Sequence, residues 1–584
     1  MTSYSATTLV DREALVVTFA VPASEIYTKN RAAAAPGSQA EYWVHKQGVR
    51  FGTGARSALV YNEAAVSSFQ VDSEKARLFV NLDWSSDHPH VNIPYQEDRG
   101  GRWVDQSMAL YPPGSERQNS FSLHIGPMPK IVPRIMAVPY GYLAGYVFTE
   151  HADGGNIDTH RAVYFGASSV KDIGRATAGF VGNNIPVTKS VFYANPEALT
   201  YSSIVDDPQG EVFLDFLDQL AGTGRYDLCL HTPEGNNSTR GLLEEAIRFM
   251  SSRYGTVTWI DHGMLDGSNN RESFVADGLN PDSSLYAADL WERFGTRYFW
   301  NTAVEILRSA SRLSFREKLA RFRLYGASVA LWRRSFLPLE LQSIHFVPAV
   351  GRLLQALRSR REQERNSLRP LEGEAYPTPL YWQHPTRTGA FFSWGTDYAY
   401  DFSGFWSEDA ERQLAEELRE IDALVANRGV FINHGYYIRK IPNIDVTYEE
   451  QGIVLLNGYF ERMLEYMAQL RDQGDLYIGT IRDLMQYWTV TEKIEFEYMP
   501  DGTIHVLNPT DKPIYGLTLA ARLADVQVDG ARPHSRTAGD DTLFWFDIAA
   551  NGSAVLKVEP RMERMSQDCP AACKPQDGSK GSRT

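Results

Sequence analysis

The stretch YVFTEHADGGNIDTHRAVYFG, residues 146–166, shows the pattern that decides the fold of the middle of the chain. It begins with an apolar, strand-like run and passes through a polar turn into the helical run HRAVYFG. The same alternation of strand-like runs and amphipathic helical windows continues to about residue 490. Such alternation predicts βαβ units and a parallel sheet. About eight strand-like runs predict a (β/α) barrel of seven or eight strands, which we place at residues 141–490.

The segments on both sides of the barrel have a different pattern. Residues 1–140 carry short strand-like runs separated by turn clusters, with few helical windows. Residues 491–560 return to that pattern, with breaks such as NPTDKP. Such spacing predicts an all-β, sandwich-like domain at each end of the barrel. The polar composition of residues 561–584 predicts a disordered tail.

The composition excludes some classes of partner. The chain has 584 residues with 58 Lys plus Arg against 72 Asp plus Glu, a net charge of −14. This acidic balance argues against a nucleic-acid partner, which would require a basic face, but it is compatible with a neutral or cationic sugar polymer. No apolar run is long enough for a transmembrane segment.

Polar and titratable side chains stand where the predicted barrel strands end. In a parallel barrel the carboxyl ends of the strands converge on one face, and active sites form there. An unpaired polar group inside an apolar strand would cost several kcal/mol. We therefore expect these groups to be hydrated, metal-bound or hydrogen-bonded to one another. In strand order they are Glu150, His151 and Asp153, then Asn195, then His231 and Glu234, then Asp261 and His262, then Asn301, and finally Asn433 and His434.

Histidine and carboxylate side chains in this set predict a divalent-metal site, with Zn²⁺ as the expected ion. Asp153 and His231 are the preferred ligands. An open metal position would hold a water, lower its pKa and polarise a substrate carbonyl. His160 is a further expected ligand, although it could equally begin a helix and face solvent. The candidates for the third ligand are His151, His160, Glu234 and His262.

Other strand-end residues are expected to transfer protons or to contact the substrate. His434 would arrive from the opposite side of the barrel as the general acid. The base would be Glu150, His151 or Asp261. The expected substrate-binding residues are strand-end polar groups and two tryptophans in loop-like surroundings, namely Asn195, Glu234, His262, Asn301, Trp382 and Trp406.

These motifs resemble those of polysaccharide deacetylases of the NodB-homology type, in the glycoside hydrolase/deacetylase barrel superfamily. That family carries a first-strand TFDDG motif, a second HSxxH motif and a late strand that ends in Leu-His. The run FTEHADGG (148–155) places Asp153 on the metal-binding aspartate. The run LHTPEGN (230–236) places His231 on the first histidine, with Glu234 near the position of the second. The run GVFINHGYY (429–437) places His434 on the catalytic acid.

The resemblance implies metal-dependent removal of N-acetyl groups from an amino-sugar polysaccharide. Larger exopolysaccharide deacetylases of this type combine such a barrel with β-sandwich modules, as is predicted for this chain. The resemblance thus implies a secreted, periplasmic or cell-surface protein from which a signal peptide has been removed, and a cytoplasmic location stays open.

Two alternatives use the same fold differently. A metal-independent glycoside hydrolase would need a pair of carboxylates about 5–10 Å apart, with no metal between them. A non-catalytic carbohydrate-binding protein would retain the barrel without its chemistry. The carboxylates available for the first alternative are Asp153, Glu234, Asp261 and Glu305.

Overall fold

A computed structural model gives the fold of the chain. It describes residues 1–10, 12–27, 41–44, 47–53, 56–72, 75–84, 91–92, 104–105, 109–126, 131–197, 199, 201–262, 270–274, 276–300, 381–384, 389–394, 410–426, 428–433, 435–439 and 446–561.

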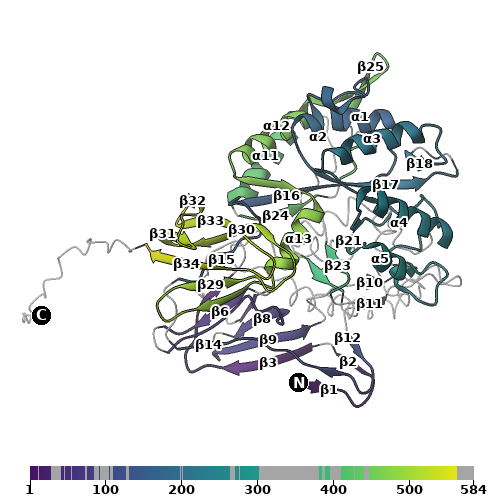
Figure 1. The fold of residues 1–584 in the computed structure, drawn as a ribbon. Helices are drawn as coiled ribbons and strands as arrows, with labels where there is room; N and C mark the ends of the chain where they lie inside the picture. The colour runs from purple at the N-terminus through teal and green to yellow at the C-terminus, as the bar shows by residue number, and fades with distance from the viewer. Residues whose placement is uncertain are drawn as a thin grey trace, which may run out of the picture.

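The middle of the chain forms one ten-stranded sheet, which curls as Figure 1 shows. Its main path runs β22-β23-β21-β20-β19-β17-β16-β24, while β18 pairs with β17 and β27 pairs with β16. All pairings are parallel except that of β22 with β23. The predicted parallel sheet is therefore confirmed. In chain order the strands are β16 (Ala144–Glu150), β17 (Val187–Ala194), β18 (Ser203–Val205), β19 (Asp227–Leu230), β20 (Thr258–Trp259), β21 (Tyr298–Trp300), β22 (Trp382–Gln383), β23 (Phe392–Trp394), β24 (Val430–Ile432) and β27 (Leu476–Gly479).

The sheet is an open half-barrel in the part of the chain that the structure describes, so the prediction of a closed barrel is not met there. The strands at the two ends of the path, β22 and β24, do not pair with each other among these residues. The last strand, β27, does not fill that gap. β24 bonds to Gly145 and Val147 of β16, and β27 and β17 share the opposite edge of β16. β27 therefore lies beside β16 in the middle of the sheet and does not connect β22 with β24.

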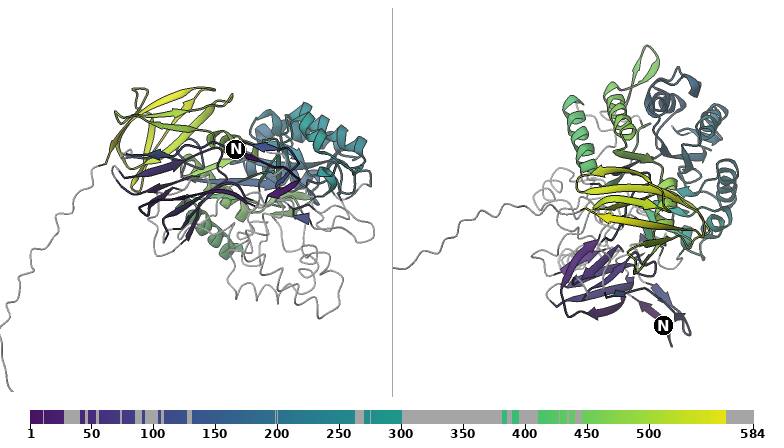
Figure 2. Two further views of the ribbon diagram at one scale, coloured as in Figure 1. Left: turned by 90° about the horizontal axis from the view of Figure 1, so that it is seen from below. Right: turned by 60° about the vertical axis from the view of Figure 1, so that its left-hand side comes forward.

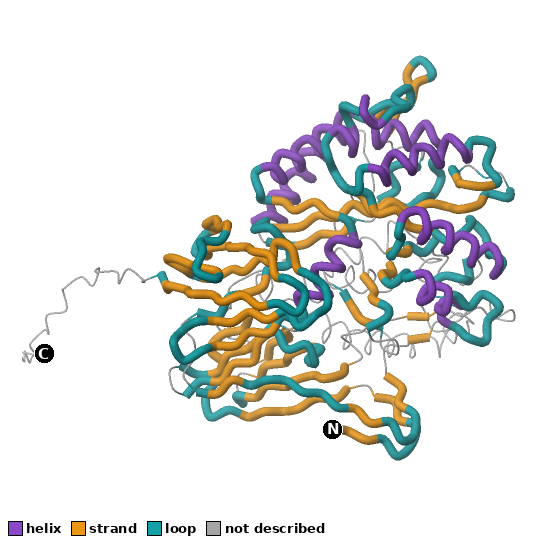
Figure 3. The backbone as a smooth tube through the Cα atoms, in the orientation of Figure 1, coloured by secondary structure: helices purple, strands orange, loops and turns teal. Residues whose placement is uncertain are grey.

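Helices cover the outer face of the sheet, and Figure 3 shows most of them on the side away from the β-domains. A buried apolar core joins sheet and helices, with Phe148, Phe216 and Met463 among its members. The helix α1 begins where Asn156 Oδ1 accepts the backbone N–H groups of residues 158 and 159. The helices around the sheet are α1 (Ile157–Phe165), α2 (Gly179–Gly182), α3 (Gly210–Gly222), α4 (Arg240–Tyr254), α5 (Ala288–Phe294), α11 (Ala410–Ala426), α12 (Gly458–Asp472) and α13 (Ile481–Thr491).

The N-terminal part forms two antiparallel four-stranded sheets that share one core, in keeping with the predicted all-β domain. Ile26 and Val49 come from one sheet, and Phe69 and Val80 from the other. The first sheet contains β4 (Ala23–Tyr27), β6 (Gly48–Phe51), β7 (Ala58–Tyr61) and β14 (His124–Ile125). The second contains β3 (Arg12–Thr18), β5 (Glu41–Val44), β8 (Ser68–Asp72) and β9 (Arg77–Trp84).

The C-terminal part is a second sandwich, and the two views of Figure 2 show it beside the first. Its strand β15 (Arg134–Ile135) comes from before the central sheet and pairs with β30. Leu484, Met485 and Trp488 of α13 belong to the same apolar core as this sandwich. The sandwich thus packs against the central domain with α13 between them. Its other strands are β28 (Glu495–Tyr498), β29 (Ile504–Leu507), β30 (Ile514–Ala521), β31 (Leu523–Val528), β32 (His534–Ala538), β33 (Asp541–Ile548) and β34 (Ser553–Pro560).

Among the helices that the structure describes, none is both long and apolar enough to cross a bilayer.

Candidate functional site

Three neighbouring parts of the central sheet place four candidate side chains together. His151 and Asp153 follow β16, His231 follows β19 and His262 follows β20. These strands are parallel and lie in the order β16-β17-β19-β20. Their carboxyl ends therefore meet at one edge of the sheet, where the sequence places the chemistry.

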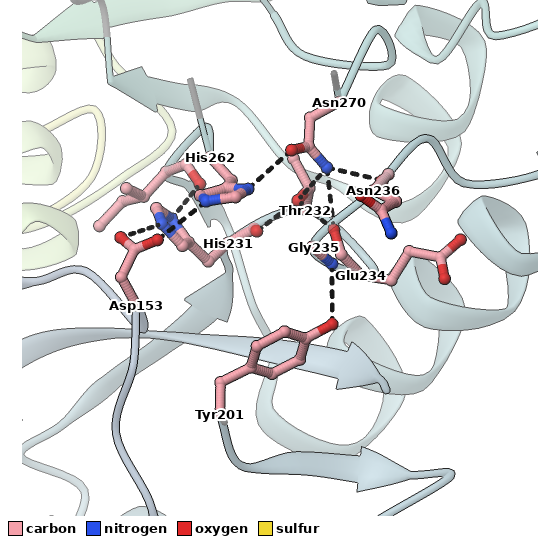
Figure 4. Close-up of polar contacts among 10 residues, drawn as sticks. Asp153, Tyr201, His231, Thr232, Glu234, Gly235, Asn236, His262 and Asn270 are labelled. Carbon is pink, nitrogen blue, oxygen red and sulfur yellow. Dashed lines mark hydrogen bonds and ion pairs between the residues drawn. The ribbon is translucent and has the colours of Figure 1, made fainter. Parts of the chain in front are cut away.

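The carboxylate of Asp153 lies between two imidazole rings, as Figure 4 shows. The Nε2 atom of His231 is 3.1 Å from Asp153 Oδ2, and the Nε2 atom of His262 is 2.8 Å from Asp153 Oδ1. The His151 ring meets the His231 ring edge to face, with centroids 5.0 Å apart. One ligand atom from each of His151, Asp153 and His231 lies within 4.8 Å of the other two. The structure therefore gathers one carboxylate and three imidazoles.

The other ring nitrogen of each Asp153-bound histidine meets an oxygen. His231 Nδ1 is 3.1 Å from the carbonyl oxygen of Ile260, and His262 Nδ1 is 2.6 Å from Asn270 Oδ1. A carbonyl oxygen only accepts hydrogen bonds, so His231 Nδ1 carries the hydrogen. In a neutral ring, His231 Nε2 then presents a lone pair to the carboxylate. Two acceptors 3.1 Å apart need a proton or a cation between them.

The electrostatics follow from burial and from these contacts. Burial tends to raise the pKa of Asp153, but His231 and His262 outweigh it and hold that pKa well below its usual range. Burial lowers the pKa of His231, although Asp153 opposes the shift. Burial also tends to lower the pKa of His262, but Asp153 and Asn270 raise it overall. Without a cation, these shifts favour an ionised Asp153 and a protonated His262.

Aromatic rings form walls around the cluster, which still opens to solvent. Phe192 lies 5.3 Å from both the His231 and the His262 ring, measured between centroids. Trp300 and Tyr436 flank His151 at 4.6 Å and 5.2 Å. Asp153 and His262 keep 19% and 24% of their side-chain surface exposed, against 1% for His231. A small polar molecule could thus approach Asp153 and His262, while the apolar walls strengthen electrostatic interactions inside.

Glu150 and His160 do not join Asp153. Successive strand residues point to opposite faces, so Glu150 points away from the face that carries His151. It forms a buried ion pair with Lys189, whose Nζ is 3.1 Å from His160 Nδ1. The ammonium group only donates, so that nitrogen of His160 is occupied as an acceptor. His160 packs on Phe213 of α3, on the helical side of the sheet.

The remaining expected residues lie in several environments. Asp261 is buried, and its Oδ1 accepts from Trp259 Nε1 at 2.6 Å and from the Phe274 N–H at 2.9 Å. Asn195 supports the loop that follows it by bonding to the Leu199 and Tyr201 backbone. Trp382 is 2% exposed, too little to stack on a sugar. Asn301, Glu305, Trp406 and His434 lie outside the described residues.

The sequence did not reveal the residues that support the cluster. Asn270 accepts from His262, and Tyr201 accepts from the Gly235 N–H at 3.1 Å through its hydroxyl. Phe192 lines the cluster from within β17. Asn270 stands in a run of turn-forming residues, and Phe192 in an ordinary apolar strand. Neither local pattern distinguishes these residues from structural ones.

Comparisons with known proteins add little. No protein-family model and no curated protein matches the chain. Among solved structures, a pullulanase type I from Bacillus subtilis str. 168 complexed with maltose is 10% identical, with 96% of this chain and 86% of that chain covered and a TM-score of 0.26. The catalytic domain of GH30 xylanase C from Talaromyces cellulolyticus is 8% identical, with 73% and 98% covered and a TM-score of 0.23. An Anoxybacillus alpha-amylase is 10% identical, with 72% and 98% covered and a TM-score of 0.23. Similarity this weak supports no conclusion about this chain.

Proposed function

We propose that the chain is a metal-dependent hydrolase that removes N-acetyl groups from an amino-sugar polysaccharide. The supporting observation is the Asp153 carboxylate between two Nε2 atoms whose rings are anchored at Nδ1. Histidine ligands of metals are commonly held in this way, with the second nitrogen bonded to a carbonyl or carboxylate oxygen. The sequence resemblance independently assigns Asp153 and His231 to a metal site.

The donor set fits a divalent ion such as Zn²⁺, which prefers imidazole nitrogen and carboxylate oxygen. Asp153, His231 and His262 would hold it. A cation between them would also satisfy the facing lone pairs of His231 Nε2 and Asp153 Oδ2. When bound, such an ion supplies Lewis acidity and lowers the pKa of a water ligand.

The chain's own residues would move the protons. The His151 ring lies edge to face against the His231 ring, and the rings of Trp300 and Tyr436 pack on two other sides of it. We assign His151 as the base that takes a proton from the attacking water onto a ring nitrogen. His434 is the candidate that protonates the departing amine, on the sequence motif. The aromatic walls would orient the apolar faces of a sugar ring.

The first experiment measures metal content of the purified full-length chain, with and without reconstitution in Zn²⁺. We expect about one equivalent in the wild type and none in Asp153→Ala. Asp158→Ala is the matched control, because Asp158 is exposed on the neighbouring helix and should keep the metal. A wild type that takes up no ion, or an Asp153→Ala variant that keeps it, would overturn the proposal.

A second pair of variants separates the roles of two histidines. His262→Ala should lose metal, whereas His151→Ala should keep metal and lose acetate release from an N-acetylated polymer. Loss of metal in His151→Ala would instead identify His151 as a ligand. One of its ring nitrogens lies close enough to the ligand atoms of Asp153 and His231 for that role. That outcome would overturn its assignment as the base.

A metal-independent glycoside hydrolase is the second candidate. The observation in its favour is a pair of carboxyl groups, one after β16 and one after β19 with β17 between these strands, whose pKa values shift in opposite directions. Burial, together with the charges of Glu197 and Asp206, raises the pKa of Glu234, whereas that of Asp153 is held low. On this alternative, Glu234→Gln abolishes release of reducing ends and a chelator has no effect. Chelator-sensitive acetate release would exclude it.

A further inference from the structure

Asn270 is a buried amide that connects the loops following β19 and β20. Its side chain has no solvent-exposed surface. On one side it meets His262 Nδ1 at 2.6 Å. On the other its Nδ2 lies 2.9 Å from the Glu234 carbonyl oxygen and 2.7 Å from that of Asn236. Figure 4 shows this amide bridging the two loops.

The chemistry of these partners determines the orientation of the amide. Both backbone partners are carbonyl oxygens, which only accept, so the NH₂ group of Asn270 must face them. Oδ1 must then face the imidazole, and an amide oxygen also only accepts. His262 Nδ1 consequently carries a hydrogen. The remaining nitrogen, Nε2, points at Asp153 Oδ1 2.8 Å away.

The loop after β19, whose carbonyl groups accept from Asn270, contains a residue in a strained backbone conformation. Thr232 directly follows His231 and has φ of +65°. This left-handed conformation is unfavourable for a β-branched residue. The Thr232 hydroxyl bonds to the Glu234 carbonyl at 3.0 Å and lies 3.2 Å from Asn270 Nδ2. Asn270 therefore contacts both the strained turn beside one histidine and the ring of the other.

We infer that Asn270 is a positioning residue for the metal site, selecting the His262 tautomer that presents an unprotonated Nε2 to the ion. The inference rests on the proposed function, since it gives His262 a ligand role. It adds a residue that touches neither metal nor substrate. Outer-shell partners of this kind typically change metal affinity 10–100-fold when removed.

The test compares three variants of the full-length chain. Asn270→Ala removes both the acceptor for His262 and the donors to the loop. Asn270→Asp keeps an acceptor for His262 Nδ1 but loses the donors. Asn237→Ala is the control, because Asn237 Oδ1 accepts from the Arg271 N–H at 2.9 Å between the same two loops. Zn²⁺ affinity is measured by competition with a chromogenic chelator. The His262 tautomer is read by ¹⁵N NMR of the metal-free, histidine-labelled chain at alkaline pH, with Asp153→Ala added to every chain so that the carboxylate 2.8 Å from Nε2 does not compete for the hydrogen.

We expect His262 to carry its hydrogen on Nδ1 in the wild type, Asn270→Asp and Asn237→Ala, and to lose that preference in Asn270→Ala. The Zn²⁺ affinity should fall about 10–100-fold in Asn270→Ala and be restored at least in part in Asn270→Asp. An Nε2–H tautomer in the wild type, or equal losses of affinity in both Asn270 variants, would overturn the inference. A wild type that binds no Zn²⁺ refutes the proposed function instead, because the tautomer is read without metal.

Discussion

The buried carboxyl group of Asp227 should make the protein less stable as the pH rises. Asp227 begins β19, and its Oδ2 accepts from the Thr258 hydroxyl at 2.7 Å. Burial raises its pKa from 3.8 to about 6, although the charge of Arg482 opposes the shift. The native state therefore binds a proton more tightly than the unfolded chain does.

The sign and size follow from linkage. Between pH 3.8 and about 6 the native state holds more protons than the unfolded state, so the free energy of unfolding falls as the pH rises. The free-energy cost of ionising the buried carboxyl group is absent below pH 3.8 and complete above about pH 6. A change from 3.8 to about 6 corresponds to about 3 kcal/mol.

Asp227→Asn removes the ionisation while keeping an oxygen that can accept from Thr258. The added NH₂ group needs a partner, and an unsatisfied one costs about 1–3 kcal/mol. The net gain at pH 8 should therefore lie between zero and about 3 kcal/mol, and it should decrease as the pH falls from about 6 to 3.8. Chemical unfolding at several pH values gives the difference directly.

Asp218→Asn is the control with the opposite sign. Asp218 pairs with Arg253 at 2.5 Å, and hydrogen bonding to that guanidinium lowers its pKa. This variant should lose a little stability at neutral pH. A constant difference between Asp227→Asn and the wild type across the whole pH range would show that the carboxylate carries no penalty, and the reasoning would be refuted.

Two further predictions concern buried packing, one on the helical side of the central sheet and one in the C-terminal sandwich. Lys189→Met should destabilise the fold by about 3–5 kcal/mol, because it leaves Glu150 buried without its cation. Adding Glu150→Gln should recover most of the lost stability. Equal stability of Lys189→Met and the wild type in chemical unfolding would contradict this. Gly516→Ala should lower the melting temperature more than Gly502→Ala does. Both glycines have positive φ, but a Cβ at Gly516 would lie 2.3 Å from the Tyr140 ring while one at Gly502 meets nothing within 4 Å. Equal shifts would argue against close packing at Tyr140.

Local pattern was sufficient to predict the main strands of the central sheet and the edge at which the candidate site lies. Alternation of strand-like and helical runs is a property of neighbouring residues, so the parallel sheet followed from it. The rule that strand ends converge then predicts Asp153, His231 and His262 at one edge of the sheet. Among the described residues the sheet is not closed. Local pattern does not predict this, because it does not determine which edge of β16 the strand β27 pairs with.

The sequence by itself determined which residue types stand at the strand ends and that a parallel sheet would bring some of them together. Only the tertiary structure decided which of them meet. Glu150 and His151 are adjacent in sequence, yet the pleat sends one to the helical core and the other to the site. Asn270 follows His262 on the same side of β20, and its amide is held by carbonyl groups of the loop that follows the neighbouring strand β19. Such contacts depend on the order and curl of the sheet, which join residues far apart in the chain and leave no periodic signal in it.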